Sequence, residues 1–148
     1  MQPRPEERER LIRYIDFLED ELSDFGKFAM VSWKKYQEDR DIRRNLERWI
    51  ENIVNCSVDI AKVILIVENR GIPSTYREAL RELGSTPGFS EELGHNISQW
   101  VSLRNILAHD YLDVRWDSIG RFIKSAEPMY RDLIEGVKTI LKASAPEE

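Results

Sequence analysis

Apolar side chains recur every three or four positions along most of this chain, and this spacing limits the possible folds more than any other feature. An α-helix has about 3.6 residues per turn, so such a period places the apolar residues on one stripe of a helix. Glycine and proline, with seven and six residues, fall mostly between these stretches, which favours helices over short strands. The first stripe consists of Leu11, Ile15, Leu18, Leu22, Phe25, Ala29, Trp33 and Tyr36.

Stripes with the same spacing predict the remaining helices. One begins near Asp39 or Asp41 and runs to Gly71, where glycine and a following proline end it. We expect Gly26 to soften the first helix, and Pro128 to kink or distort the last, because proline removes a helical hydrogen bond. The expected helices cover residues 6–37, 39–71, 75–84, 90–107 and 116–142.

Four long helices and one short helix predict an all-α fold. Narrow apolar stripes at this spacing suit an antiparallel, up-and-down four-helix bundle, to which the short helix is an addition. The 148 residues suit a single domain over 1–148, with frayed ends at about 1–5 and 143–148, where the apolar pattern stops.

The composition predicts a soluble, cytoplasmic protein without membrane association. Hydrophobic residues make up 41%, and the longest aliphatic run, Val63–Val67, is too short to cross a bilayer. The single cysteine, Cys56, lies in an apolar stretch and is expected in the core, which fits a reducing compartment. A net charge of −5 argues against a protein that coats nucleic acid but leaves room for a local basic cleft.

The side chains that can carry chemistry gather in one short segment at the end of a predicted helix. In an ideal helix Arg104 and His109 point about 140° apart, so both reach one substrate only if the helix ends or bends before His109. A helix end at which His109 interacts with free carbonyl groups is the alternative. His95, the other histidine, has no acidic or histidine partner at helical spacing and suits a structural role. The polar side chains of the segment include Arg104, Asn105, His109 and Tyr111.

The segment Arg104–Tyr111 resembles the Arg-x-x-x-x-His-x-Tyr signature of HepT-like proteins in the HEPN superfamily. Residues 41–48 and 58–61 are similar to the second helix of that family, and 73–80 is similar to its short third helix. The resemblance covers residues 5–142. It implies a HEPN-like, usually dimeric, metal-independent endoribonuclease, the toxin of a toxin–antitoxin pair whose partner is a minimal nucleotidyltransferase, often called MntA.

The same residues suit cleavage of RNA by its own ribose 2′-hydroxyl, which needs no metal. We expect His109 to act as the acid or base, since a histidine side chain ordinarily titrates near neutrality. Arg104 can donate two hydrogen bonds to phosphate oxygens as charge develops. Asn105 orients His109 or the substrate, and Tyr111 binds a phosphate or stacks on a base.

The motif has only one histidine, whereas acid and base catalysis usually needs two groups. A symmetric dimer would supply both His109 and Arg104 twice, which places the expected site at a two-fold interface. Asp110 and Asp113 are not expected to hold a metal ion, because no ordered set of ligands accompanies them, and no cofactor is expected.

Tyr111 is the expected point of control. The resemblance implies that the nucleotidyltransferase silences the enzyme by attaching AMP to Tyr111, where the added phosphate would occupy the anion site at Arg104. The alternative is a tyrosine that packs at the end of the bundle with its hydroxyl hydrogen-bonded.

Two other functions stay open on the sequence. One is a non-catalytic HEPN module that binds a nucleotide or a partner nucleotidyltransferase, and the other is a plain helical interaction protein. The intact Arg104, His109 and Tyr111 favour the ribonuclease over the interaction protein and separate it only weakly from the module.

Overall fold

The computed structural model describes residues 1–145, and every regular element within them is an α-helix. None of these helices is both long enough and apolar enough to cross a membrane. The helices are α1 (Pro5–Leu22), α2 (Phe25–Ala29), α3 (Trp33–Glu38), α4 (Arg40–Val67), α5 (Tyr76–Leu83), α6 (Glu91–Ser98), α7 (Val101–His109) and α8 (Leu112–Ala143).

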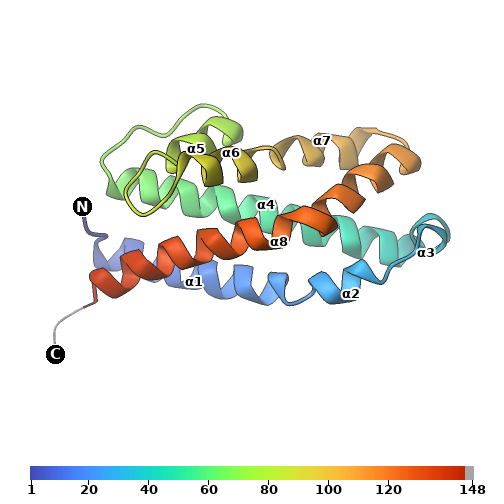
Figure 1. Ribbon diagram of the computed structural model, residues 1–148, viewed down its shortest axis with the longest axis horizontal. Helices are drawn as coiled ribbons and strands as arrows, with labels where there is room; N and C mark the ends of the chain where they lie inside the picture. Colours follow the sequence, from blue (N-terminus) through green and yellow to red (C-terminus); the bar gives the residue numbers. More distant parts are fainter. Residues whose placement is uncertain (146–148) are drawn as a thin grey trace.

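The helices form the expected antiparallel four-helix bundle with an extra short helix (Figure 1). The first rod is α1 continued by α2 and α3, the second is α4, the third is α6 continued by α7, and the fourth is α8. The short helix α5 packs against α4 and α6. The turn from α7 to α8 lies at the same end of the bundle as α3 (Figure 1), which places the chemically promising segment at that end.

The prediction of one helix over residues 6–37 is wrong, because the structure divides it into α1, α2 and α3. At the first break the Ser23 hydroxyl donates to the Asp20 carbonyl oxygen at 2.5 Å, a local bond that competes with the helix. At the second break Ser32 caps α3 by accepting from the backbone N–H of Lys35. Gly26 lies inside α2, so neither interruption falls at the glycine.

Tertiary packing explains the first break. Phe25, the first residue of α2, packs edge-on against Trp49 at 4.7 Å between centroids and stacks on Phe122 at 5.7 Å. Phe25 is buried, so its ring lies in the core directly after the interruption. Aromatic burial of this kind outweighs the few helical hydrogen bonds that the break removes.

The prediction of one continuous helix over residues 90–107 is also wrong, because the structure divides this stretch into α6 and α7. Trp100 lies at the break, with its ring 5.3 Å from Phe122 and its Nε1 donating to the Met129 sulfur at 3.4 Å. The apolar period continues through this position, and for that reason the sequence pattern gives no sign of the interruption.

Two further boundaries differ less. Helix α4 begins at Arg40, close to the predicted start, with Asp39 as its cap, but it ends at Val67 rather than at Gly71. Helix α8 begins at Leu112, one turn earlier than predicted, and continues through Pro128 without a break.

The residues that the stripes assign to the core are mostly buried, and each such Leu or Ile contributes about 1.5–3 kcal/mol. Cys56 is buried as expected, and burial raises the pKa of its thiol to about 12. Trp33 is an exception at 36% exposed. The fully buried stripe residues include Leu11, Leu18, Leu22, Leu46, Ile53, Ile60, Ile64, Ile119, Leu133 and Val137.

Helices α5 and α6 approach so closely that glycine is needed on both. A Cβ on Gly84 would lie 2.6 Å from the Ser90 carbonyl oxygen, and one on Gly94 would lie 2.8 Å from that of Leu80. The two glycines therefore allow α5, which begins at Tyr76, to pack closely against α6.

Among the described residues the first helix begins at Pro5 and the last ends at Ala143, and side chains near both ends make polar contacts. The Met1 ammonium lies 3.3 Å from the Glu68 carboxylate, and Arg8 donates to the Ser144 hydroxyl at 2.8 Å. Residues 146–148 of the predicted frayed end lie outside the described residues.

Candidate functional site

The motif residues occupy the end of α7 and the turn that follows it. Arg104, Asn105 and His109 lie in α7, whose last residue is His109. Asp110 leaves the helix in an extended conformation (φ −92°, ψ 166°), and Tyr111 is the N-cap residue of α8. The helix thus ends just after His109, not before it, so Arg104 and His109 remain about 140° apart around α7.

Burial shows which way α7 faces. Leu103 and Leu107 are buried and hold α7 on the bundle, whereas Asn105 and His109 are exposed. Asn105 and His109 are four residues apart and therefore share one side of the helix, as predicted. Arg104 is half-buried and lies beside the buried stripe, so its guanidinium leaves α7 on a different side from the imidazole.

The side chain of Arg104 lies against an aromatic ring. The guanidinium carbon lies 5.3 Å from the centroid of the Tyr76 ring at the start of α5. The Nε atom of Arg104 is buried and has no hydrogen-bond partner among the described residues. Contact with the ring face replaces some of the water that this cation loses.

Tyr111 projects from the turn into solvent. Its side chain is 85% exposed, which does not fit the alternative of a tyrosine packed at the end of the bundle. Its phenol is therefore open to a second protein.

A half-buried polar link between α8, the turn and α4 holds the turn in place, and no local sequence pattern predicts it. Arg115 donates from Nε to the Asp110 carbonyl oxygen at 2.8 Å and forms an ion pair with Glu47 of α4 at 3.3 Å. The fully buried Tyr36 donates its hydroxyl to the same Glu47 carboxylate, and burial raises the pKa of Tyr36. Glu47 and Arg115 are 68 residues apart, so no local spacing pattern could have paired them.

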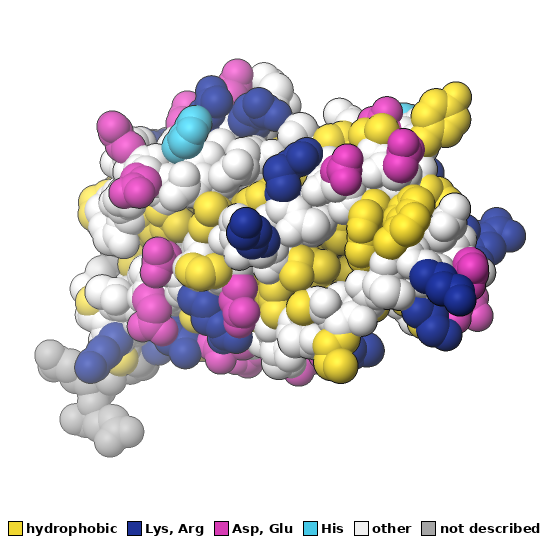
Figure 2. Space-filling model, turned by 45° about the vertical axis from the view of Figure 1, so that its right-hand side comes forward, with side chains coloured by type: hydrophobic (Ala, Val, Ile, Leu, Met, Phe, Trp, Pro, Cys, Tyr) yellow, Lys and Arg dark blue, Asp and Glu magenta, His cyan; other side chains and the backbone are white. Residues whose placement is uncertain are grey.

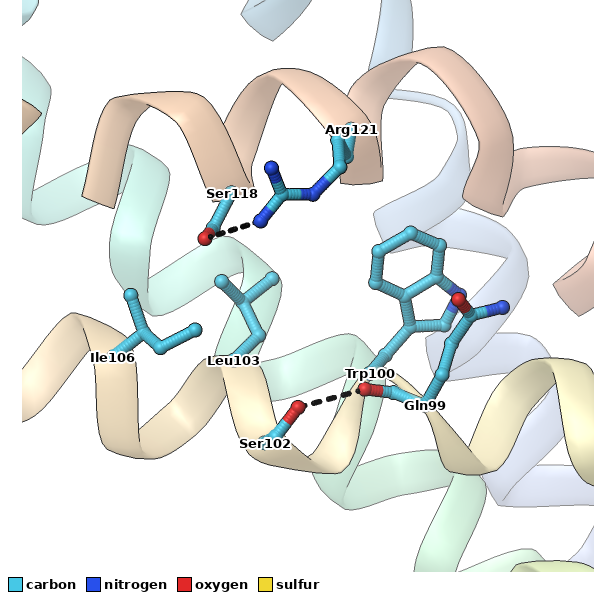
Figure 3. Close-up of a pocket in the computed structure, with 7 residues that line it drawn as sticks. All are labelled: Gln99, Trp100, Ser102, Leu103, Ile106, Ser118 and Arg121. Carbon is cyan, nitrogen blue, oxygen red and sulfur yellow. Dashed lines mark hydrogen bonds between the residues drawn. The ribbon is translucent and has the colours of Figure 1, made fainter. Parts of the chain in front are cut away.

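A hollow of about 250 Å³ lies between α7 and α8 (Figure 3). Ser102 and Ile106 line the hollow from α7. They precede His109 by seven and three residues, so they lie on the side of α7 that also carries His109. On the opposite wall Arg121 donates to the Ser118 hydroxyl at 3.0 Å. The hollow therefore combines one cation, hydroxyl groups and apolar walls, and sequence analysis missed Arg121. Its lining consists of Gln99, Trp100, Ser102, Leu103, Ile106, Ser118 and Arg121.

The other predicted residues lie apart from one another. His95 is exposed on α6, and Asp110 and Asp113 are exposed around the α7–α8 turn. Within residues 1–145, no three His, Cys, Asp or Glu side chains come together in a way that could hold a metal ion.

The surface around the turn is mixed in character. Figure 2 brings this end of the bundle forward and shows acidic and basic side chains interspersed with apolar ones. Large exposed apolar side chains at this end include Trp33 at 36%, Val114 at 41% and Tyr111 at 85%. Positive charge near the motif is therefore confined to individual side chains.

Solved structures of HEPN toxins share this fold. The tri-AMPylated HEPN toxin of Shewanella oneidensis, in complex with its MNT antitoxin, superposes with a TM-score of 0.75 at 19% identity, over 88% of this chain and 97% of the toxin. A toxin–antitoxin complex with AMP-PNP gives a TM-score of 0.77 at 18% identity, over 88% and 98% of the two chains. These likenesses define the class of the fold, a HEPN-type helical bundle.

The sequence comparison then gives the family. The model described as "Ribonuclease HepT-like" matches residues 18–137, and the chain belongs to this HepT-like family. It is 28% identical over 94 residues to the "mRNA nuclease HepT" of Shewanella oneidensis, covering 64% of this chain and 68% of that protein. It is 29% identical over 129 residues to the "tRNA nuclease HepT" of Aphanizomenon flos-aquae, covering 87% and 83%.

Proposed function

We propose that the chain is the toxin of a HepT/MntA-type toxin–antitoxin pair and acts in the cytoplasm as a metal-independent endoribonuclease. One observation carries the proposal: α7 carries an exposed Asn105 and His109 on one side and, on another, an Arg104 that forms no ion pair among the described residues. The family membership and the nuclease names of the two relatives support it.

The chemistry needs an acid, a base and a cation. A base removes the proton from the ribose 2′-hydroxyl, and O2′ attacks the adjacent phosphorus. The P–O5′ bond breaks, O5′ takes a proton from the acid, and the products are a 2′,3′-cyclic phosphate and a 5′-hydroxyl. His109 fills the role of base, Asn105 orients it, and Arg104 stabilises the negative charge on the phosphorus oxygens.

The arrangement on α7 favours a site shared between two copies of the chain. Arg104 and His109 of one copy diverge by about 140° around the helix, so one copy alone presents them poorly to a single phosphate. A homodimer that brings two α7 helices together supplies a second His109 as the acid. The exposed apolar side chains at this end, which include Trp33 and Val114, provide contact area for such a dimer.

The hollow beside α7 extends the RNA site. Ser102 lies about 10 Å along the helix axis from His109, which a short piece of single-stranded RNA can span. The apolar walls of the hollow suit a base, and Arg121 suits a phosphate. We therefore assign the hollow to a nucleotide that flanks the scissile bond.

The partner antitoxin is an MntA-type nucleotidyltransferase that modifies Tyr111. The solved toxin with which this chain shares its fold is described as tri-AMPylated, and Tyr111 offers an exposed phenol. The phenol oxygen attacks the α-phosphorus of ATP, a new P–O bond forms, and pyrophosphate leaves. The added phosphate blocks the site by occupying the position of the RNA backbone.

The shared site is tested by mixing wild-type chains with His109→Ala chains under conditions in which dimers exchange. A ninefold excess of the variant leaves about one wild-type chain in ten paired with another wild-type chain, so RNA cleavage per wild-type chain should fall about tenfold. A His95→Ala chain, altered at the other exposed histidine, is the matched control. Unchanged cleavage in the His109→Ala mixture would contradict a shared site, and RNA binding without cleavage by the wild type would favour the non-catalytic module.

A further inference from the structure

One tyrosine ring holds two cations from different helices. The Lys62 ammonium of α4 lies 4.9 Å from the centroid of the Tyr76 ring, and the Arg104 guanidinium of α7 lies 5.3 Å from the same centroid. Tyr76 thus joins α4, α5 and α7 at one point, and it concentrates two positive charges beside the motif in a protein of net charge −5.

Neither cation has a carboxylate partner in direct contact among the described residues. Among the described residues no ion pair within 4.0 Å involves Lys62 or Arg104. Asp59, one turn earlier on α4, attracts Lys62 but does not form an ion pair with it. Like charges held on one ring repel each other, so a ligand that carries negative charge would relieve that repulsion.

Tyr76 is held firmly enough to position another side chain. It is the first residue of α5, where Thr75 caps the helix by accepting from the Glu78 backbone N–H. The contact of Gly84 with Gly94 fixes the same helix against α6. The ring is 41% exposed, so its contacts with the two cations lie at the surface, where an RNA strand can reach them.

We propose that Lys62, Tyr76 and Arg104 form a phosphate clamp for RNA, in which Tyr76 positions Arg104 and Lys62 binds the RNA backbone beside the scissile phosphate. The buried, unpartnered Nε of Arg104 supports this assignment, since it leaves the outer nitrogens of the guanidinium as the groups that face a phosphate. The clamp rests on the proposed ribonuclease function and adds to it two residues that the motif does not contain.

The positioning role of Tyr76 is tested by steady-state cleavage of RNA. Tyr76→Leu removes the ring face, and we expect kcat to fall about tenfold or more with little change in KM. Tyr76→Phe keeps the ring face and should rescue turnover to about half of the wild-type value or better. Phe17→Leu, which alters an equally exposed aromatic residue on α1, is the matched control.

The binding role of Lys62 is tested on the His109→Ala background, which we expect to bind RNA without cutting it. Lys62→Gln should reduce the slope of log affinity against log salt concentration by about 0.7, the value for one phosphate contact with a single strand. Lys27→Gln removes another lysine that lies over an aromatic ring, at 5.1 Å from Phe28, and should leave the slope unchanged.

The outcomes separate the clamp from the proposed function. If the wild type cleaves RNA but Tyr76→Leu has the kcat of Phe17→Leu, or Lys62→Gln keeps the salt slope of Lys27→Gln, the clamp is overturned while the ribonuclease stands. If the wild type neither binds nor cleaves RNA, both are overturned. Circular dichroism confirms that each variant is folded before it is compared.

Discussion

Arg115 donates a hydrogen bond of 2.8 Å to the carbonyl oxygen of Asp110, the residue that ends α7 directly after His109. The same guanidinium reaches Glu47 on α4, so the position of His109 depends on an ion pair in the wall of the bundle. The end of α7 that carries His109 is thus anchored by half-buried side chains of α8 and α4.

Arg115→Gln should therefore lower kcat for RNA cleavage about tenfold, because a small displacement of a catalytic group is costly. Arg131→Gln, which breaks an exposed ion pair with Glu127 on α8, is the matched control and should have little effect. Steady-state kinetics on both variants give the comparison. Equal turnover by the two variants would remove Arg115 from the support of the site.

Arg121→Gln should raise KM for RNA about three- to tenfold and leave kcat nearly unchanged, because the proposed site places this residue at a flanking nucleotide and not at the reacting phosphate. Lys124→Gln, one turn further along α8 and also exposed, controls for the loss of one charge. A KM that changes equally in both variants would assign the effect to general electrostatics and not to the hollow.

Co-expression with an MntA-type nucleotidyltransferase should add one or more AMP groups to the wild-type chain, and Tyr111→Phe should abolish the addition. Intact-mass spectrometry measures both. Tyr14→Phe alters a half-buried tyrosine on α1 and should be modified like the wild type. An adduct that persists on Tyr111→Phe would place the modification elsewhere, and a fully modified wild type that still cleaves RNA would refute its role as a switch.

Gly94→Ala should destabilise the protein by about 1–3 kcal/mol, since the new methyl group would meet the Leu80 carbonyl at 2.8 Å. Gly120→Ala is the opposite case, because nothing lies within 4 Å of the added Cβ on α8, and alanine should stabilise the helix by up to about 1 kcal/mol. Urea denaturation measures both changes. The close packing of α5 on α6 is in doubt if Gly94→Ala unfolds at the same urea concentration as the wild type.

The sequence was most informative where structure is determined locally. The apolar stripes gave the bundle and most of its core, and the motif could be found because Arg104 and His109 lie close together in the chain. The breaks at Ser23 and Trp100 were missed because the apolar period runs through both. Burial of aromatic side chains overrides local helix formation at these two positions.

The supporting parts of the site could not be predicted for a related reason. Glu47 of α4 pairs with Arg115 of α8. Tyr76 of α5 contacts Lys62 of α4 and Arg104 of α7, so each of these contacts joins two different helices. Only the packing of α4 against the other helices brings them together, and no spacing rule expresses that packing. The missed residues are accordingly those that act on the motif from other helices.

Cleavage of RNA in excess EDTA, measured for the wild type, His109→Ala and His95→Ala in parallel, tests the central claim most directly. The account predicts that the wild type and His95→Ala cleave RNA to a 2′,3′-cyclic phosphate and a 5′-hydroxyl, and that His109→Ala is slower by about a hundredfold or more while it stays folded. Cleavage by a folded His109→Ala at the wild-type rate, or activity that appears only after Mg²⁺ is added, would contradict it.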